Sequence, residues 1–235
     1  GYGYPYGFYV DPTYVLLIIG MVLALAASGQ MKSTFARYQQ VRSHSGLTGA
    51  QTAQRILNAA GIYDVTIVPI SGRLTDHYDP RTKRLALSQD VYGRTSVAAV
   101  CVAAHECGHA IQHNISYAPL NIRSAIVPVA NIGSSLSWPI FLLGLILSIP
   151  ALTTAGIVLF SLAVLFQLVT LPVEFNASSR ALKMLESTGI LSCEENKGAK
   201  KVLTAAALTY VAALASSILQ LLRLIILSGG RRRDD

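Results

Sequence analysis

The chain has 235 residues, of which 52% are hydrophobic and 13% are charged. Soluble domains average about 25% charged residues, so this composition predicts a protein embedded in a membrane. The 19 Lys and Arg residues exceed the 12 Asp and Glu residues, which gives a formal net charge of +7. No basic run alternates with aromatic residues as a nucleic-acid surface requires, so we expect no nucleic-acid partner. We assign the basic excess to contact with anionic lipid and to membrane topology.

Residues 1–30 are predicted to form an N-terminal segment and the first membrane span. Gly, Tyr and Pro dominate residues 1–9, which predicts an irregular segment whose tyrosines suit the membrane interface. Asp11 and Pro12 are typical of a helix N-cap and first helical position, and the apolar run 14–27 follows them. Basic residues come soon after this run and none precedes it. The positive-inside rule therefore places the following segment in the cytoplasm.

Residues 31–123 are polar enough to form a cytoplasmic lobe. Thr48 and Gln51 resemble a capping box, which predicts a short helix that ends before Gly61. Period-two alternation and turn residues then predict a strand followed by a hairpin, over 64–70, 74–78 and 84–88. An exposed edge strand could hold an extended peptide by main-chain hydrogen bonds, or it could only pack the lobe, and the residues favour neither role.

The motif that carries chemistry is His105-Glu106-Cys107-Gly108-His109, within a helix predicted over 96–115. Residues four apart share a helix face, so His105 and His109 can reach one ion while Glu106 stands beside the open coordination position. Zinc lowers the pKa of bound water, and Glu106 could take the proton during attack on a carbonyl. The alternative is a buried apolar helix with incidental polar residues, but each of these side chains would then need a buried partner.

The cysteines favour neither a disulfide framework nor a zinc knuckle. Their number is odd and their spacing lacks Cys-x-x-Cys, at Cys101, Cys107 and Cys193. This pattern suits thiols in a reducing cytosol. For Cys107, inside the motif, we expect a role in helix packing.

Residues 124–173 contain no charged side chain and predict a transmembrane hairpin, with spans over 134–149 and 154–170. Glu174 follows directly, at the membrane face from which the hairpin departs, and we expect it to open the next helix. A carboxylate at this position is costly unless it is paired or coordinated.

Residues 174–202 are predicted to contain a helix over 175–185 and a polar connection over 186–201, and residues 203–235 a fourth apolar helix and a basic tail. If the apolar run 203–227 spans, the basic residues 231–233 lie outside, against the positive-inside rule. The run could instead lie beside the lobe or re-enter the membrane. We expect it to span.

A catalytic zinc site typically has three protein ligands, so the motif needs a third. His113 lies two turns beyond His105, about 12 Å along the axis, which is too far to share one ion. By elimination, Glu174 is the best remaining ligand. Three other glutamates could be the third ligand by residue type, but they lie in the predicted polar connection, where exposure to solvent explains them more simply: Glu186, Glu194 and Glu195.

Polar residues after Glu174 are candidates for supporting roles. Asn176 or Ser178 could hydrogen-bond a ligating imidazole and so set its tautomer. Arg180 could anchor a substrate carbonyl or stabilise the tetrahedral oxyanion.

These motifs resemble the YugP family of bacterial membrane zinc metallopeptidases. The resemblance rests on 105–109, the hairpin, Glu174-Phe-Asn-Ala-Ser-Ser-Arg-Ala181, the tyrosine-rich start and the late Ala-Ala-Leu-Thr-Tyr-Val-Ala-Ala213. The chain is more distantly similar to HtpX and CAAX prenyl proteases, which are gluzincins. The resemblance implies zinc endopeptidase chemistry at the cytoplasmic membrane face, with Glu174 as third ligand. Those distant relatives carry Asp four residues after the ligand Glu, where this chain has Ser178.

We therefore predict an α+β integral membrane protein, mainly helical, with a small zincin-like lobe and three or four transmembrane helices. The predicted function is a multi-pass zinc endopeptidase of the cell membrane that cleaves proteins or peptides near the bilayer. His105, His109 and Glu174 bind Zn²⁺, Glu106 is the general base and Arg180 assists. The alternative is a non-catalytic, zinc-stabilised scaffold or quality-control protein. A metal transporter would need ionisable residues along its spans, and 124–173 has none.

Overall fold

The computed structural model describes residues 11–231. The expected irregular segment 1–9 and the last residues of the basic tail lie outside this range. Within it the elements are, in chain order, α1 (Tyr14–Gln39), α2 (Gly49–Ala59), β1 (Thr66–Pro69), β2 (His77–Asp79), β3 (Arg84–Leu87), α3 (Gln89–Tyr92), α4 (Val97–Asn114), α5 (Ala118–Ile146), α6 (Pro150–Ser187) and α7 (Cys193–Arg231). The mainly helical α+β class is confirmed.

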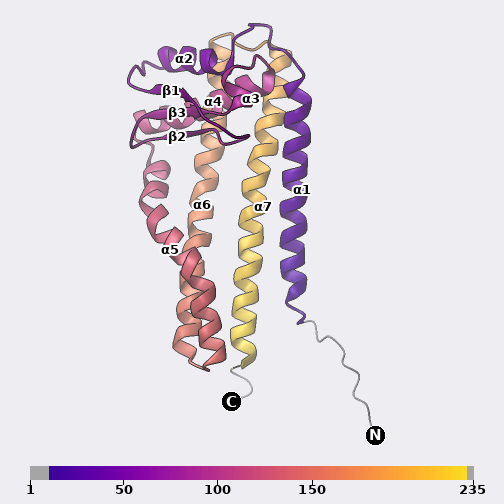
Figure 1. The fold of residues 1–235 in the computed structure, drawn as a ribbon, viewed down its shortest axis with the longest axis vertical. Helices are drawn as coiled ribbons and strands as arrows, with labels where there is room; N and C mark the ends of the chain where they lie inside the picture. Colours follow the sequence, from indigo (N-terminus) through magenta and orange to yellow (C-terminus); the bar gives the residue numbers. More distant parts are fainter. Residues whose placement is uncertain (1–10, 232–235) are drawn as a thin grey trace.

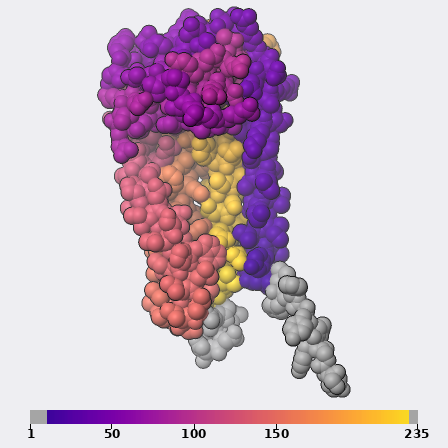
Figure 2. All heavy atoms as spheres, viewed as in Figure 1, coloured from indigo at the N-terminus to yellow at the C-terminus, as the bar shows by residue number. Residues whose placement is uncertain are grey.

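Four long helices extend from one side of a small lobe (Figure 1). Within the described residues, α1, α5, α6 and α7 are each long and apolar enough to cross a membrane. The chain runs up α1 into the lobe, down α5, up α6 and down α7, so α1 begins and α7 ends at the end far from the lobe. In the space-filling view the lobe forms a continuous cap over these helices (Figure 2). The fourth apolar stretch is thus part of a helix of spanning length that packs along α1.

The lobe contains the predicted sheet, with strand order β1-β3-β2. The hairpin is confirmed, with its first strand at His77–Asp79 instead of 74–78, because β2 pairs antiparallel with β3 and Tyr78 lies opposite Leu85. The first predicted strand is confirmed as β1, which pairs parallel with β3. The capping box is also confirmed, since Thr48 and Gln51 exchange backbone and side-chain hydrogen bonds at the start of α2. The core lies between this sheet, α2, α4 and the lobe ends of α6 and α7.

At the start of α1, the Asp11 carboxylate accepts a 3.0 Å hydrogen bond from the backbone N–H of Thr13. This bond stabilises the turn before the helix, whose N-cap is Thr13 and whose first residue is Tyr14, two residues later than predicted. The helix continues to Gln39, well past the boundary expected at residue 30. The first span therefore extends without interruption into the lobe.

The transmembrane hairpin is longer than expected on the lobe side. Both helices continue through prolines, and α5 contains Pro128 and Pro139 while α6 contains Pro172. The prediction that Glu174 opens a helix is wrong, because Glu174 lies within α6. The apolar face of α6 continues into the lobe, so its packing there outweighs the local cost of Pro172.

The polar connection predicted over 186–201 is wrong in extent, since only residues 188–192 separate α6 from α7. Gly189, with φ of 68°, follows the end of α6. The Glu195 N–H donates to the Ser192 hydroxyl, and the Ser192 N–H donates to the Glu195 carboxylate. This is a capping box, so the polar residues after Ser192 begin a helix rather than a loop.

Candidate active site

The motif helix α4 is buried between the lobe and α6. It begins at a cap, where the Ser96 hydroxyl accepts from the Ala99 N–H at 3.0 Å. Gly108 lies at its contact with α6, and a Cβ added there would lie 2.3 Å from the Ala177 carbonyl oxygen. The missing side chain therefore lets the two backbones approach closely. This approach brings the histidines of α4 within reach of Glu174 on α6.

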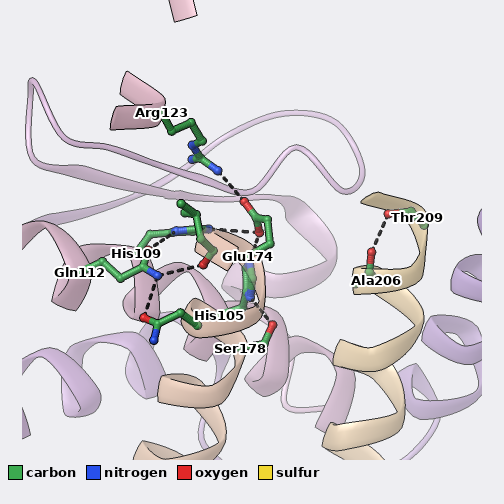
Figure 3. Close-up of polar contacts among 10 residues, drawn as sticks. His105, His109, Gln112, Arg123, Glu174, Ser178, Ala206 and Thr209 are labelled. Carbon is green, nitrogen blue, oxygen red and sulfur yellow. Dashed lines mark hydrogen bonds and ion pairs between the residues drawn. The ribbon is translucent and has the colours of Figure 1, made fainter. Parts of the chain in front are cut away.

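His105, His109 and Glu174 form the one cluster of metal-binding type found among the described residues (Figure 3). One ligand atom from each residue lies within 4.8 Å of the others. Glu174 Oε2 is 2.9 Å from His105 Nε2 and 3.4 Å from His109 Nε2. Two imidazoles and a carboxylate are the donor set of a catalytic zinc site that keeps one coordination position for water.

Hydrogen bonds orient both imidazoles. His105 Nδ1 lies 2.9 Å from Ser178 Oγ, and His109 Nδ1 lies 3.0 Å from Gln112 Oε1. Since an amide oxygen only accepts, His109 carries its proton on Nδ1 and leaves Nε2 free to bind a metal. The same tautomer of His105 is satisfied by the Ser178 oxygen. The residues present therefore fit a zinc ion.

Sequence reasoning missed Gln112, which is fully buried. Its side-chain amide donates to the Val173 carbonyl at 2.9 Å and to Asn176 Oδ1 at 3.0 Å, which ties α4 to α6 beside the cluster. Asn176 thus acts through Gln112 and not on an imidazole directly. The available signal was spacing, because Gln112 follows His109 by three residues and so lies on the same helix face.

Sequence reasoning also missed Arg123. Its Nη1 donates to Glu174 Oε1 at 2.8 Å, from α5 to α6. The signal was that Arg123 and Glu174 are the charged residues on either side of the uncharged segment 124–173. Arg180 lies elsewhere, where its Nε donates to Asn176 Oδ1 at 2.7 Å and its guanidinium lies over the Tyr117 ring.

Glu106 lies next to the cluster and is 7% exposed. It lines a cavity of about 150 Å³ together with His105 and Glu174. Burial raises the pKa of the Glu106 carboxyl to about 7. A carboxyl group with that pKa can accept and release a proton near neutral pH.

Two other polar residues of α4 have structural roles. His113 is outside the cluster, as predicted, and its Nδ1 lies 2.8 Å from the Tyr78 hydroxyl of β2. Cys107 is buried with its Sγ 3.6 Å from the Ala53 carbonyl oxygen, and burial raises the pKa of its thiol. Its predicted packing role is consistent with this contact.

Over residues 13–229 the chain matches the family described as "Putative neutral zinc metallopeptidase". The chain belongs to this family. It is also 49% identical over 212 residues to the "Putative membrane protease YugP" of Bacillus subtilis (strain 168), an alignment that covers 90% of this chain and 94% of that relative. No solved structure matches. The family confirms the resemblance noted from the motifs and confirms zinc as the cofactor of this zinc metallopeptidase chain.

Proposed function

We propose that this chain is a zinc endopeptidase whose catalytic centre is formed by His105, His109, Glu174 and Glu106. The observation that carries the proposal is the convergence of three metal-binding side chains, on two helices, beside a buried carboxyl group that faces the same cavity. Within the described residues no fourth protein ligand joins the cluster. A catalytic zinc site needs a fourth coordination position that no protein ligand takes, so that water can bind there.

His105, His109 and Glu174 would hold zinc, which would supply an acidified water and polarisation of the scissile carbonyl. Glu106 accepts the proton of that water as its oxygen attacks the carbonyl carbon. The same carboxyl group then donates the proton to the leaving amine, so the peptide C–N bond breaks and Glu106 returns to its starting form. Arg180 does not line this cavity, so its proposed role as an anchor applies to a substrate carbonyl outside the cavity, through the Nη groups that Asn176 does not contact.

Helix lengths support a site near the membrane surface. Glu174 follows Pro150 by 24 residues in α6, and a helix rises 1.5 Å per residue, so about 36 Å separate them. Met31, which lines the cavity, follows Tyr14 by 17 residues, or about 26 Å, in α1. These lengths match a hydrocarbon core of about 30 Å. Substrates of this proposed enzyme are proteins or peptides at or near the bilayer.

Charge supports a lobe in the cytoplasm. Basic residues are frequent at and just past the lobe end of α1, with Lys32, Arg37 and Arg42, whereas the turn between α5 and α6 has none and the far end of α7 has Arg231. The positive-inside rule favours the side with more Lys and Arg for the cytoplasm.

The competing function is a scaffold in which zinc only joins the lobe to the hairpin. The two functions differ at Glu106, since a structural site needs no general base. The test uses the full-length protein in lipid nanodiscs, with bound zinc measured by elemental analysis and cleavage of casein by mass spectrometry. We expect Glu106→Gln to keep one zinc and lose cleavage, and Glu174→Gln to lose both.

The matched control is Glu186→Gln, an exposed carboxylate further along α6, which should keep both zinc and cleavage. Undiminished cleavage by the Glu106→Gln protein would refute the mechanism and favour a contaminating protease or another base.

A further inference from the structure

The cavity beside the metal cluster has a polar wall and an apolar wall. His105, Glu106 and Glu174 form the polar wall, from α4 and α6. The remaining surface comes mostly from apolar side chains of α1, α4, α7 and the loop before β2, including Met31, Leu74, Val102, Leu203, Ala206 and Ala207. Figure 3 shows the α7 segment that carries Ala206 across from the cluster. A peptide whose scissile carbonyl lies at the cluster therefore has the apolar wall of this cavity next to it.

Asp76, Ser178 and Glu174 are already bonded, whereas the Tyr210 hydroxyl, which also lines the cavity, makes none of the hydrogen bonds found among the described residues. The Asp76 carboxylate accepts from the backbone N–H and hydroxyl of Ser88 at 2.7 and 3.0 Å. Ser178 bonds His105, and Glu174 bonds Arg123 and the histidines. Apart from the Tyr210 hydroxyl and the Glu106 carboxyl, a polar substrate side chain would find few free partners here in exchange for the water it loses, whereas an apolar one would lose nothing.

We propose that this cavity binds one large apolar side chain, of the size of leucine, methionine or phenylalanine, from the substrate residue adjoining the scissile bond. The proposal rests on the proposed function. The cavity, including the polar wall where the metal and the scissile group would lie, measures about 150 Å³. An apolar cavity of about that volume in another protein holds benzene, so the part beside the apolar wall suits one such side chain and no more.

Two consecutive alanines set the size of the cavity on the α7 side. Ala206 and Ala207 both line it, and the Thr209 hydroxyl donates to the Ala206 carbonyl at 2.6 Å. Each alanine has a Cβ and no further side-chain atoms, so a larger residue at either position would occupy space meant for substrate. The neighbouring Leu208 is exposed and does not line the cavity. Ala206 and Ala207 are therefore the specificity-determining residues.

The test measures cleavage-site preference in the zinc-loaded, full-length protein in nanodiscs. A denatured proteome digest is cleaved, and the new termini are identified by mass spectrometry. Wild type should show Leu, Met or Phe enriched at one position next to the cleaved bond. Two fluorogenic peptides that differ only there, Leu against Ala, then give kcat/KM values for each variant.

Ala206→Leu should lower the kcat/KM ratio of the Leu peptide to the Ala peptide by about 10- to 100-fold, as expected when a pocket loses the space for a few methylenes. Leu208→Phe, on the exposed face of α7, should leave the ratio unchanged. Zinc content reports on folding of each variant, and Ala207→Val tests the same wall with a smaller addition.

Cleavage by wild type without an apolar preference, or with a preference for charged residues, would overturn this inference and leave the proposed function intact. An unchanged peptide ratio in zinc-loaded Ala206→Leu and Ala207→Val proteins would do the same. A wild-type protein that binds zinc and cleaves nothing would overturn the proposed function, and this inference with it.

Discussion

Arg123 and Glu174 form an ion pair, with Nη1 and Oε1 2.8 Å apart, across the two lobe-side ends of the transmembrane hairpin. No charged residue lies between them in the sequence. Both side chains are largely buried, so each would be costly without the other. The pair joins α5 to the metal cluster and holds one carboxylate oxygen while the other faces the histidines.

Arg123→Ala should weaken zinc binding by about 10- to 100-fold, the usual effect of losing a partner of a metal ligand. The physical reason is that Glu174 loses the donor that orients it. Competition with a zinc chelator of known affinity measures the change. Arg73→Ala is the control, because Arg73 is exposed and its one ion pair within the described part of the chain is with Asp90. Equal zinc affinity in the Arg123→Ala and wild-type proteins would show that the pair does not orient the ligand.

Ser178→Ala should weaken zinc binding by about 10-fold or more, because His105 loses the acceptor at its Nδ1. Ser178→Asp should restore it, since a carboxylate accepts that hydrogen bond more strongly than a hydroxyl does. Zinc titration of both variants under identical conditions is the measurement. If Asp proves worse than Ala at this position, added negative charge near Glu174 dominates over ring orientation.

Gly108→Ala should destabilise the protein by about 1–3 kcal/mol, the range for overpacking a close contact. The new Cβ would meet the Ala177 carbonyl oxygen at 2.3 Å and push α4 from α6, so zinc affinity should fall too. Gly29→Ala is the matched control, because a Cβ there meets nothing within 4 Å in the middle of α1. Thermal unfolding in detergent checks both, and equal melting temperatures for the two variants would contradict the close contact.

Removal of zinc should lower the melting temperature of wild type. Free zinc at 100 times its Kd stabilises a folded protein by about 2.7 kcal/mol. A melting temperature that rises with free zinc in wild type, and stays constant in His105→Ala, is the expected result. A dependence that persists in His105→Ala would place the stabilising zinc elsewhere.

Cysteine labelling should report the orientation of the lobe. Cys193 is exposed at the lobe end of α7, whereas Cys101 and Cys107 are buried. A membrane-impermeant maleimide should label Cys193 in inverted vesicles and not in intact cells. Leu147→Cys in a Cys193→Ser background, at the exposed turn after α5, should give the reverse. Labelling of Cys193 in intact cells would place the lobe outside.

Several features followed from local sequence because each depends on neighbouring residues in one element. His105 and His109 share a helix face by their spacing, and the capping box at Thr48 needs only residues three apart. The absence of charge over 124–173 was enough to predict membrane helices. Even the start of α7 had such a signal at Ser192 and Glu195, which the reading of 186–201 as a polar connection overlooked.

Contacts between different helices and strands could be determined only from the tertiary structure. Glu174 could be selected only by elimination, whereas the fold places it within α6 and against both histidines. The bonds of Gln112 and Arg123 depend on how α4 and α5 are rotated and shifted along α6, and the cavity depends on the position of α7. Sequence periodicity determines which side chains share a face of one helix. The distance between faces of different helices is decided by packing, here by the approach that Gly108 allows.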